Sequence, residues 1–343
     1  MNQAPARIAL VLGGGNALGA YEVGAYAAFE QAGHAPSWIA GASVGAINAA
    51  LIAGNPPGRR LAALRTFWER AASPSGPLPL VGSAWYRVAQ LSSAMQTRMF
   101  GRPSLFVTAM PGLPQPVALY DAEPMRRTLA ELVDFGRIAG GEPRVSVIAV
   151  DVQTGAEVVF DSARERITPD HILASAALIP DFPPVEIDGR LLVDGGLSSN
   201  VPVNVVLSEQ SGGRVVCFAI DPFPRVGARP KSWIDASERQ SDLMYACQTE
   251  HMLRHHAEAD RLRRRLAEAG AQPAPDEVTV FRLEYAGGPD ETSMKMWDFS
   301  HQVLARREAA GRADMDAALH LWRTAPPTGA GLVIHSPVRH GEP

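Results

Sequence analysis

Two patterns of hydrophobic and polar residues alternate along the first part of the chain. Residues 8–12 and 38–40 are continuous apolar runs, and each is followed by glycines and then by a segment rich in helix formers. A short, continuous apolar run is typical of a strand buried on both faces, whereas apolar residues three or four apart indicate a helix with one buried face. The first fifty residues therefore predict strand, helix, strand, helix, which is a βαβ unit.

The same alternation continues to about residue 220. We expect further strands at 144–150, 157–160, 190–193 and 214–220, with helices between them. Five or so buried strands alternating with helices predict an α/β fold, in which a doubly wound parallel or mixed sheet lies between helices. We assign this domain to residues 7–222.

The remainder of the chain has a different pattern. Residues 233–269 and 294–323 have helical periodicity, and 278–285 resembles a single strand. We expect residues 223–325 to form a mostly helical C-terminal extension packed on the core. Residues 326–343 are rich in proline and glycine and are expected to be a loose tail.

One segment inside the first domain allows two interpretations. Residues 73–116 are rich in proline, and their centre has an amphipathic pattern that runs from Trp85 to Phe100. This centre is either a lid over an apolar site or a surface helix that buries its own apolar face.

Composition limits the classes of function. The chain has 343 residues, of which 46% are hydrophobic, so a large core is expected. The net charge of −4 gives no electrostatic reason to expect a nucleic acid partner. Cys217 and Cys247 lie far apart and indicate neither a disulfide framework nor a zinc site. Nothing in the sequence specifies an oligomeric state.

Location can also be predicted from the sequence. No secretory leader is recognisable, and the longest uncharged apolar stretch, residues 39–53, is too short to cross a bilayer. We expect a cytoplasmic protein whose contact with the membrane is peripheral.

The second apolar run leads into a motif with chemical meaning. Gly41-Ala42-Ser43-Val44-Gly45 has the form Gly-x-Ser-x-Gly and lies between a predicted strand and a predicted helix. In this context the pattern indicates a nucleophile elbow, in which Gly41 and Gly45 permit a sharp turn and Ser43 is exposed at a helix N-terminus. A tightly packed helix cap with the same residues is the alternative interpretation.

Two further groups follow the ends of predicted strands. Gly13, Gly14 and Gly15 follow the first strand, and their backbone N–H groups are candidates for an oxyanion hole. Asp194 ends a later apolar run and is followed by two glycines, which let another backbone approach its carboxylate. Each group alone is also ordinary turn chemistry. Together with Ser43 they supply the nucleophile, base and oxyanion donors of an ester hydrolase, since carboxyl ends of parallel strands share one edge of a sheet.

Several other functions are less compatible with the sequence. The glycine loop fits only a loosened dinucleotide pattern, and the second strand does not end in the acidic residue that a nucleotide-binding oxidoreductase needs. An α/β-hydrolase triad would need a histidine after Asp194 and more strands before the elbow. The histidines that follow Asp194 include His251, His255, His256, His301 and His320.

The long C-terminal helix carries two further candidates. His251 and His255 are spaced to share a metal, but no third ligand is evident, so no metal and no cofactor are expected. The arginines between residues 261 and 265 are diluted by acidic neighbours, which favours a solvated helix face over a membrane-binding one.

The ordered set of Gly13-Gly14-Gly15, Gly41-Ala42-Ser43-Val44-Gly45 and Asp194-Gly195-Gly196 resembles the patatin-like phospholipase family, in its bacterial branch, over residues 7–220. The resemblance implies a Ser43–Asp194 dyad without a catalytic histidine, oxyanion donors at Gly13, Gly14 and Gly15, and no metal cofactor. It also implies a lipid ester as substrate. Leu18 stands where the family usually has Arg or Lys, which makes a phospholipid substrate less certain than ester hydrolysis. A catalytically silent lipid-binding protein on the same fold stays open as an alternative.

Overall fold

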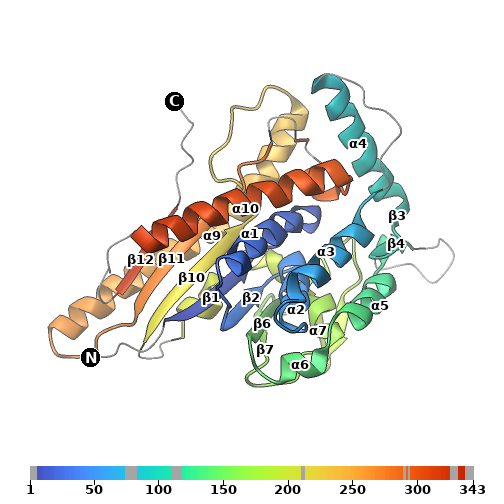
Figure 1. Ribbon diagram of the computed structural model, residues 1–343. Coiled ribbons are helices and arrows are strands. Elements are labelled where there is room, and N and C mark those ends of the chain that lie inside the picture. Colours follow the sequence, from blue (N-terminus) through green and yellow to red (C-terminus); the bar gives the residue numbers. More distant parts are fainter. Residues whose placement is uncertain are drawn as a thin grey trace.

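The computed structural model describes residues 6–73, 83–109, 118–209, 213–288, 291–292, 294–324 and 331–336. Within these residues a mixed sheet lies between two layers of helices, so the predicted doubly wound α/β fold is confirmed (Figure 1). Each strand of the sheet is hydrogen-bonded to the next in the order β12 (Gly331–His335), β11 (Glu277–Glu284), β10 (Arg214–Asp221), β1 (Arg7–Leu12), β2 (Trp38–Gly41), β6 (Arg144–Asp151), β9 (Arg190–Asp194) and β8 (Val185–Ile187), and β7 (Glu157–Asp161) also pairs with β6.

The central strands are parallel and the later ones are not. Strands β12, β11, β10, β1, β2 and β6 pair in parallel, whereas β7 and β9 pair antiparallel to β6, and β8 pairs antiparallel to β9. The continuous apolar runs identified in the sequence form β1 and β2 at the centre, where both faces are buried. Their carboxyl ends, at Leu12 and Gly41, lie side by side.

Alternate residues of each strand contact different helix layers. Leu10 and Leu12 face the larger core cluster, whereas Ala9 and Val11 face the smaller one. On the larger side lie α1 (Ala20–Gln31), α2 (Val44–Ala53), α3 (Arg60–Ala71) and α10 (His301–Thr324), and on the other lie α8 (Val203–Leu207) and α9 (Trp233–Glu268).

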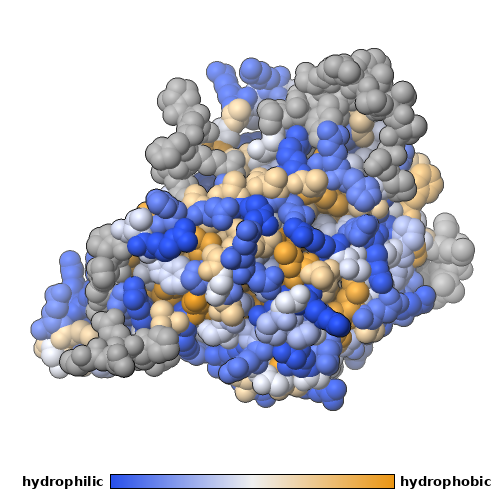
Figure 2. Space-filling view, viewed as in Figure 1, coloured by the Kyte–Doolittle hydropathy of each residue, from blue (hydrophilic) through white to orange (hydrophobic). Residues whose placement is uncertain are grey.

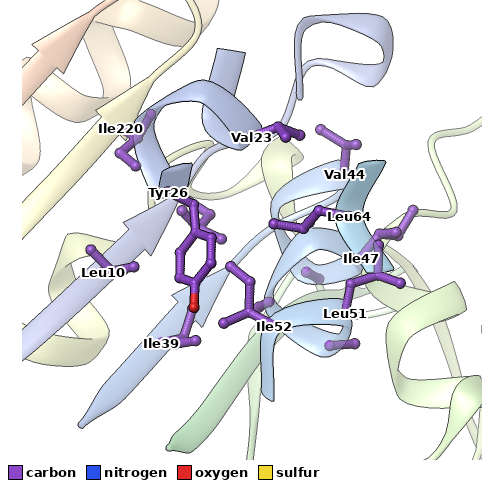
Figure 3. Packing of buried hydrophobic residues seen from close by; sticks show 14 of the residues in the cluster. Leu10, Val23, Tyr26, Ile39, Val44, Ile47, Leu51, Ile52, Leu64 and Ile220 are labelled. Carbon is purple, nitrogen blue, oxygen red and sulfur yellow. The ribbon is translucent and has the colours of Figure 1, made fainter. Parts of the chain in front are cut away.

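Figure 3 shows the packing on the side of the sheet that carries the larger core cluster. The Tyr26 ring of α1 lies over Leu10 and Ile39 of the sheet, and Leu64 of α3 faces Ile47 of α2. The outer surface of this layer is mixed, with hydrophilic residues spread over the helices and smaller hydrophobic areas between them (Figure 2). Helices α1 and α2 are buried on nearly all sides, whereas α3 and α10 bury one stripe and present the other to solvent.

The C-terminal part continues the sheet. Strand β11 pairs with β10 over eight residues, and β12 pairs with β11. Helix α10 crosses α1 in backbone contact, because a Cβ at Gly24 would lie 1.7 Å from the carbonyl oxygen of Glu308 and one at Gly311 would lie 1.8 Å from that of Tyr21. Glycine is thus required at both positions of this crossing.

Part of the predicted loose tail is ordered secondary structure. Residues 331–335, which we expected to be loose, form the edge strand β12. The proline and glycine content of the tail obscured the short apolar run at 332–334, which is enough to pair with an exposed sheet edge.

The remaining elements connect the strands and helices described above. They are η1 (Asn16–Gly19), α4 (Ser83–Phe100), β3 (Gly101–Arg102), β4 (Phe106–Thr108), β5 (Tyr120–Asp121), α5 (Glu123–Leu132), α6 (Phe135–Ala139), α7 (Pro169–Ser175), η2 (Gly195–Leu197) and η3 (Lys295–Trp297). Strands β3, β4 and β5 form a second, small sheet.

Helix α4 buries the opposite side from the one that its sequence suggests. Its exposed side chains include Val88, Met95, Met99 and Phe100, whereas Ala94 and Thr97 are buried. A surface helix that buries its own apolar face is therefore not what residues 88–100 form. Among the described residues, no helix is both long enough and apolar enough to cross a membrane.

Candidate active site

Ser43 occupies a sharp turn between β2 and α2. Its φ is 55° and its ψ is −127°, a conformation that costs a non-glycine residue about 1–3 kcal/mol. A Cβ at Gly41 would lie 2.5 Å from the carbonyl oxygen of Gly45, and a Cβ at Gly45 would lie 2.3 Å from that of Leu12. The two predicted elbow glycines are therefore required because three backbone segments meet there.

The partner strands explain why Asp194 reaches this turn. Strand β2 pairs with β6 at residues 144–147, and β9 pairs with β6 at residues 149–151. Strand β7 overlaps both stretches on β6, so it occupies the other edge, and β2 and β9 share one edge. Strand β9 therefore continues the edge of β6 beyond the point where β2 ends, and it runs antiparallel to β2. The last residue of β9, Asp194, lies beside the elbow.

The environment of Asp194 makes it an unusual carboxyl group. It is 2% exposed, it accepts a hydrogen bond from the N–H of Gly196 at 2.7 Å, and the Ser43 side chain lies near enough to favour its ionised form. Burial raises the pKa of Asp194 to about 7, although the neighbouring Ser43 side chain and the Gly196 N–H act in the opposite direction. A Cβ at Gly195 would lie 2.3 Å from the carbonyl oxygen of Ile148, which explains the first of the two glycines after Asp194.

The backbone N–H groups of Gly13, Gly14 and Gly15 differ in whether they already have a hydrogen-bond acceptor within the protein. The N–H of Gly13 donates to the Ile220 carbonyl at 3.2 Å, and the N–H of Gly14 donates to the Asn200 carbonyl at 3.0 Å. Two of the three amides predicted to form an oxyanion hole are therefore engaged within the protein. In the described part of the chain, Gly15 is the one of the three glycines whose N–H has no acceptor.

A pocket of about 420 Å³ opens beside Ser43 and Asp194. Its walls are mainly apolar, with residues that come from the elbow helix, from α3, from α7 and from loops that are distant in the sequence. The apolar side chains that line it include Ile47, Phe67, Leu105, Phe106, Leu173, Phe182, Val185, Trp297 and Phe299. A concave apolar site with a few convergent polar groups is typical of a small-molecule binding site.

One wall of this pocket is aromatic, and no pattern in the sequence indicates it. The Phe106 ring centroid lies 5.2 Å from that of Phe182 and 6.0 Å from that of Trp297. These residues come from three segments, and Trp297 belongs to the predicted C-terminal extension. Helix α4 contributes no lining residue among those described, but the Arg98 guanidinium lies 4.3 Å from the Trp297 ring centroid and packs behind the wall.

Charged groups at the pocket are mostly acidic. Arg126 is the one cation among its described lining residues, and it forms ion pairs with Glu123 and Asp170. Asp121 and Glu186 also line the pocket. The lining therefore has a net negative charge, even without counting Asp194.

The alternative candidates lie elsewhere. His251, His255 and His256 lie on α9, and His301 and His320 lie on α10; none is among the described residues that line the pocket. Within the described ranges, no three histidine, cysteine, aspartate or glutamate residues are grouped so as to hold a metal ion. The described part of the chain therefore brings no histidine from α9 or α10 into the pocket at Ser43.

Comparison with known proteins gives matches along most of the chain. A family model described as patatin-like phospholipase matches residues 10–207, more than half of the chain, and one described as patatin phospholipase matches residues 227–327. Uncharacterized NTE family proteins of Mycobacterium bovis and Mycobacterium tuberculosis are each 28% identical over 211 residues. That alignment covers 61% of this chain but 30% of either relative, so the chain spans less than a third of their length.

Solved structures with a similar arrangement include VipD from Legionella pneumophila, with 14% identity, a TM-score of 0.43, and coverage of 93% of this chain and 67% of VipD. Another is the type III effector protein ExoU, with 14% identity, a TM-score of 0.41, and coverage of 94% and 54%. The first of the two family models covers the glycine loop, the Ser43 elbow and Asp194. The chain belongs to the patatin-like phospholipase family.

Proposed function

We propose that this protein is a serine acyl hydrolase that cleaves lipid esters, with Ser43 as the nucleophile and Asp194 as its base. The observation that carries the proposal is the placement of Ser43, in its sharp turn, beside the buried carboxyl group of Asp194 at the same apolar pocket. Membership of the patatin-like phospholipase family supports lipid hydrolysis as the general activity.

The environment of Asp194 suits it to this role. An ordinary aspartate is a weak base at neutral pH, but a carboxylate with a pKa of about 7 accepts a proton far more readily. Asp194 takes the hydroxyl proton as Ser43 Oγ attacks the ester carbonyl. When the tetrahedral intermediate collapses, Asp194 returns this proton to the leaving alcohol, and an acyl-enzyme remains. Water then attacks the acyl-enzyme with Asp194 again as base, which releases the fatty acid and restores Ser43.

The oxyanion needs donors that are not already engaged. Among the described residues at this point, the N–H groups of Gly15 and of Val44, the first residue of α2, have no internal acceptor. We assign the oxyanion to these two groups, in place of Gly13 and Gly14. The positive end of the α2 dipole acts in the same direction, and removal of one such donor typically costs about 10²–10³ in rate.

The pocket lining favours one type of ester. Its apolar and aromatic walls fit an acyl chain, whereas its negative charge disfavours an alcohol portion that is itself anionic. Leu18, which replaces the cation expected in the glycine loop, is fully buried. We therefore propose substrates with an uncharged or zwitterionic head group.

Contact with a lipid surface is assigned to α4. Met95, Met99 and Phe100 are 57%, 65% and 68% exposed, and the helix packs against the Trp297 side of the pocket wall. Met95→Glu/Met99→Glu is expected to reduce hydrolysis of vesicle lipid at least threefold while leaving hydrolysis of a soluble ester unchanged. Equal rates on vesicles would contradict this contact.

The proposed function is tested by hydrolysis of p-nitrophenyl hexanoate. Ser43→Ala and Asp194→Asn are expected to abolish it, whereas a His251→Ala/His255→Ala/His256→Ala variant is expected to keep it. Activity that survives Ser43→Ala would refute the assignment. A folded wild type that binds fatty acyl esters without hydrolysing any of several classes would show a lipid-binding protein instead.

A further inference from the structure

A buried polar cluster lies behind the glycine loop and takes no part in the proposed chemical steps. It consists of Glu22 on α1, Asn48 on α2 and Trp68 on α3, all of which are buried. Asn48 Nδ2 donates to Glu22 Oε2 at 2.7 Å, and Trp68 Nε1 donates to Asn48 Oδ1 at 3.0 Å. The indole N–H therefore fixes which end of the Asn48 amide faces Glu22.

Both ends of the glycine loop contact this cluster. Asn48 Nδ2 also donates to the Gly19 carbonyl at 3.1 Å, where the loop ends and α1 begins. The N–H of Gly13, where the loop begins, lies near the Glu22 carboxyl and stabilises its ionised form. Asn48 is in α2, the helix that directly follows Ser43. The cluster therefore connects the glycine loop to the elbow.

Stability alone does not explain a carboxyl group at this position. Glu22 Oε1 has no hydrogen-bond partner among the described residues, and burial raises the pKa of Glu22 to about 8. Burial of a polar atom without a partner typically costs about 1–3 kcal/mol. An apolar side chain of similar length would avoid this cost, but it would remove the acceptor that holds Asn48.

We infer that Glu22 and Asn48 are positioning residues, which hold the glycine loop against the Ser43 elbow so that the Gly15 N–H stays where the oxyanion forms. This inference rests on the proposed function. Neither residue lines the pocket within the described chain, so neither contacts the substrate. Loss of the pair is therefore expected to lower kcat and to leave KM nearly unchanged, because the oxyanion exists only after the substrate is bound.

Three variants separate positioning from stability. Glu22→Gln keeps an oxygen acceptor for Asn48, and its kcat on p-nitrophenyl hexanoate should stay within twofold of the wild type. Glu22→Met has similar length but no acceptor, and its kcat should fall at least tenfold at unchanged KM. Val280→Ala removes a buried side chain on the other face of the sheet, and its kcat should be unchanged although its Tm falls.

A double variant covers the case in which Glu22→Met does not fold. Glu22→Met/Asn48→Leu replaces both members of the pair, so that the Trp68 N–H is the one group of the cluster left without its partner, and we expect this variant to be less stable than the wild type but folded and slow. A kcat equal to that of the wild type in either apolar variant would overturn the inference. So would a rise in KM instead of a fall in kcat.

Hydrogen exchange provides a readout that needs no ester turnover. The peptide that contains residues 13–19 should exchange faster in Glu22→Met than in the wild type, whereas Glu22→Gln and Val280→Ala should match the wild type there. Unchanged exchange in Glu22→Met would also overturn the inference. Faster exchange in a protein that hydrolyses no ester would instead remove the proposed function and keep the structural role of the pair.

Discussion

Acidification should inactivate this protein in a way that reports directly on Asp194. The carboxylate must be ionised to accept the Ser43 proton, and burial raises its pKa from 3.8 to about 7. Below pH 7 the ionised fraction falls about tenfold per pH unit, so kcat/KM should be about 10% of its plateau at pH 6 and about 1% at pH 5. An ordinary aspartate would keep full activity at both values.

The assay is the initial rate of hydrolysis of p-nitrophenyl hexanoate from pH 5 to pH 9, at substrate concentrations well below KM, with released p-nitrophenol measured after quenching to one pH. This substrate has no group that ionises in the range, so the profile reports the free enzyme. Asp188→Asn is the matched control, because Asp188 is an exposed carboxylate in the turn that precedes β9. Its profile should coincide with that of the wild type.

A profile that is flat between pH 5 and pH 7, in protein that circular dichroism shows to be folded throughout, would refute the reasoning. It would mean that desolvation does not control the proton affinity of Asp194, or that another group accepts the proton.

Three other outcomes follow from the structure. Gly45→Ala should abolish activity and lower Tm, because its Cβ would lie 2.3 Å from a backbone carbonyl, whereas Gly213→Ala, with no atom within 4 Å, should change neither. The pKa of Glu22 is raised from 4.5 to about 8, so the folded state binds the Glu22 proton more tightly than the unfolded state. The protonated Glu22 therefore contributes fully to the free energy of unfolding below pH 4.5, and this contribution falls by about 1.4 kcal/mol per pH unit up to pH 8. Glu22→Gln should therefore lose less unfolding free energy than the wild type between pH 5 and pH 7 in urea titrations, and equal slopes would contradict the raised pKa. Asp121→Asn/Glu186→Gln should raise the rate on short-chain phosphatidylglycerol relative to phosphatidylcholine at least threefold at low salt, and a constant ratio would exclude the pocket charges as the selective element.

The part of the site that the sequence predicts is the part that local geometry determines. The strand, turn and helix around Ser43 need glycine at two fixed positions, and that requirement is visible in five consecutive residues. Similarly, the two glycines that follow Asp194 in the sequence indicate that another backbone segment approaches its carboxyl group. In the same way, continuous apolar runs predicted the central strands, because burial on both faces leaves no polar position.

What the sequence did not predict depends on partners that are distant along the chain. The Gly13 and Gly14 amides are engaged by carbonyls of Ile220 and Asn200, and no pattern within the loop indicates this. The aromatic wall brings Trp297 against Phe106, and the spacing of either residue in its own segment looks like ordinary core. Strand β12 forms because β11 offers a free edge, which the composition of the tail does not reveal.

The crossing of α1 and α10 at Gly24 and Gly311 has a consequence for biosynthesis. Helix α1 begins where the glycine loop ends, and the loop carbonyl of Ala17 accepts a hydrogen bond at 2.9 Å from Arg307, which is 290 positions later in the chain. A ribosome must therefore make the elbow, Asp194 and nearly all of the sheet before the loop acquires this support. We expect a nascent chain that ends before α10 to contain Ser43 and Asp194 and yet to be inactive, so that hydrolysis begins only after synthesis has passed this helix.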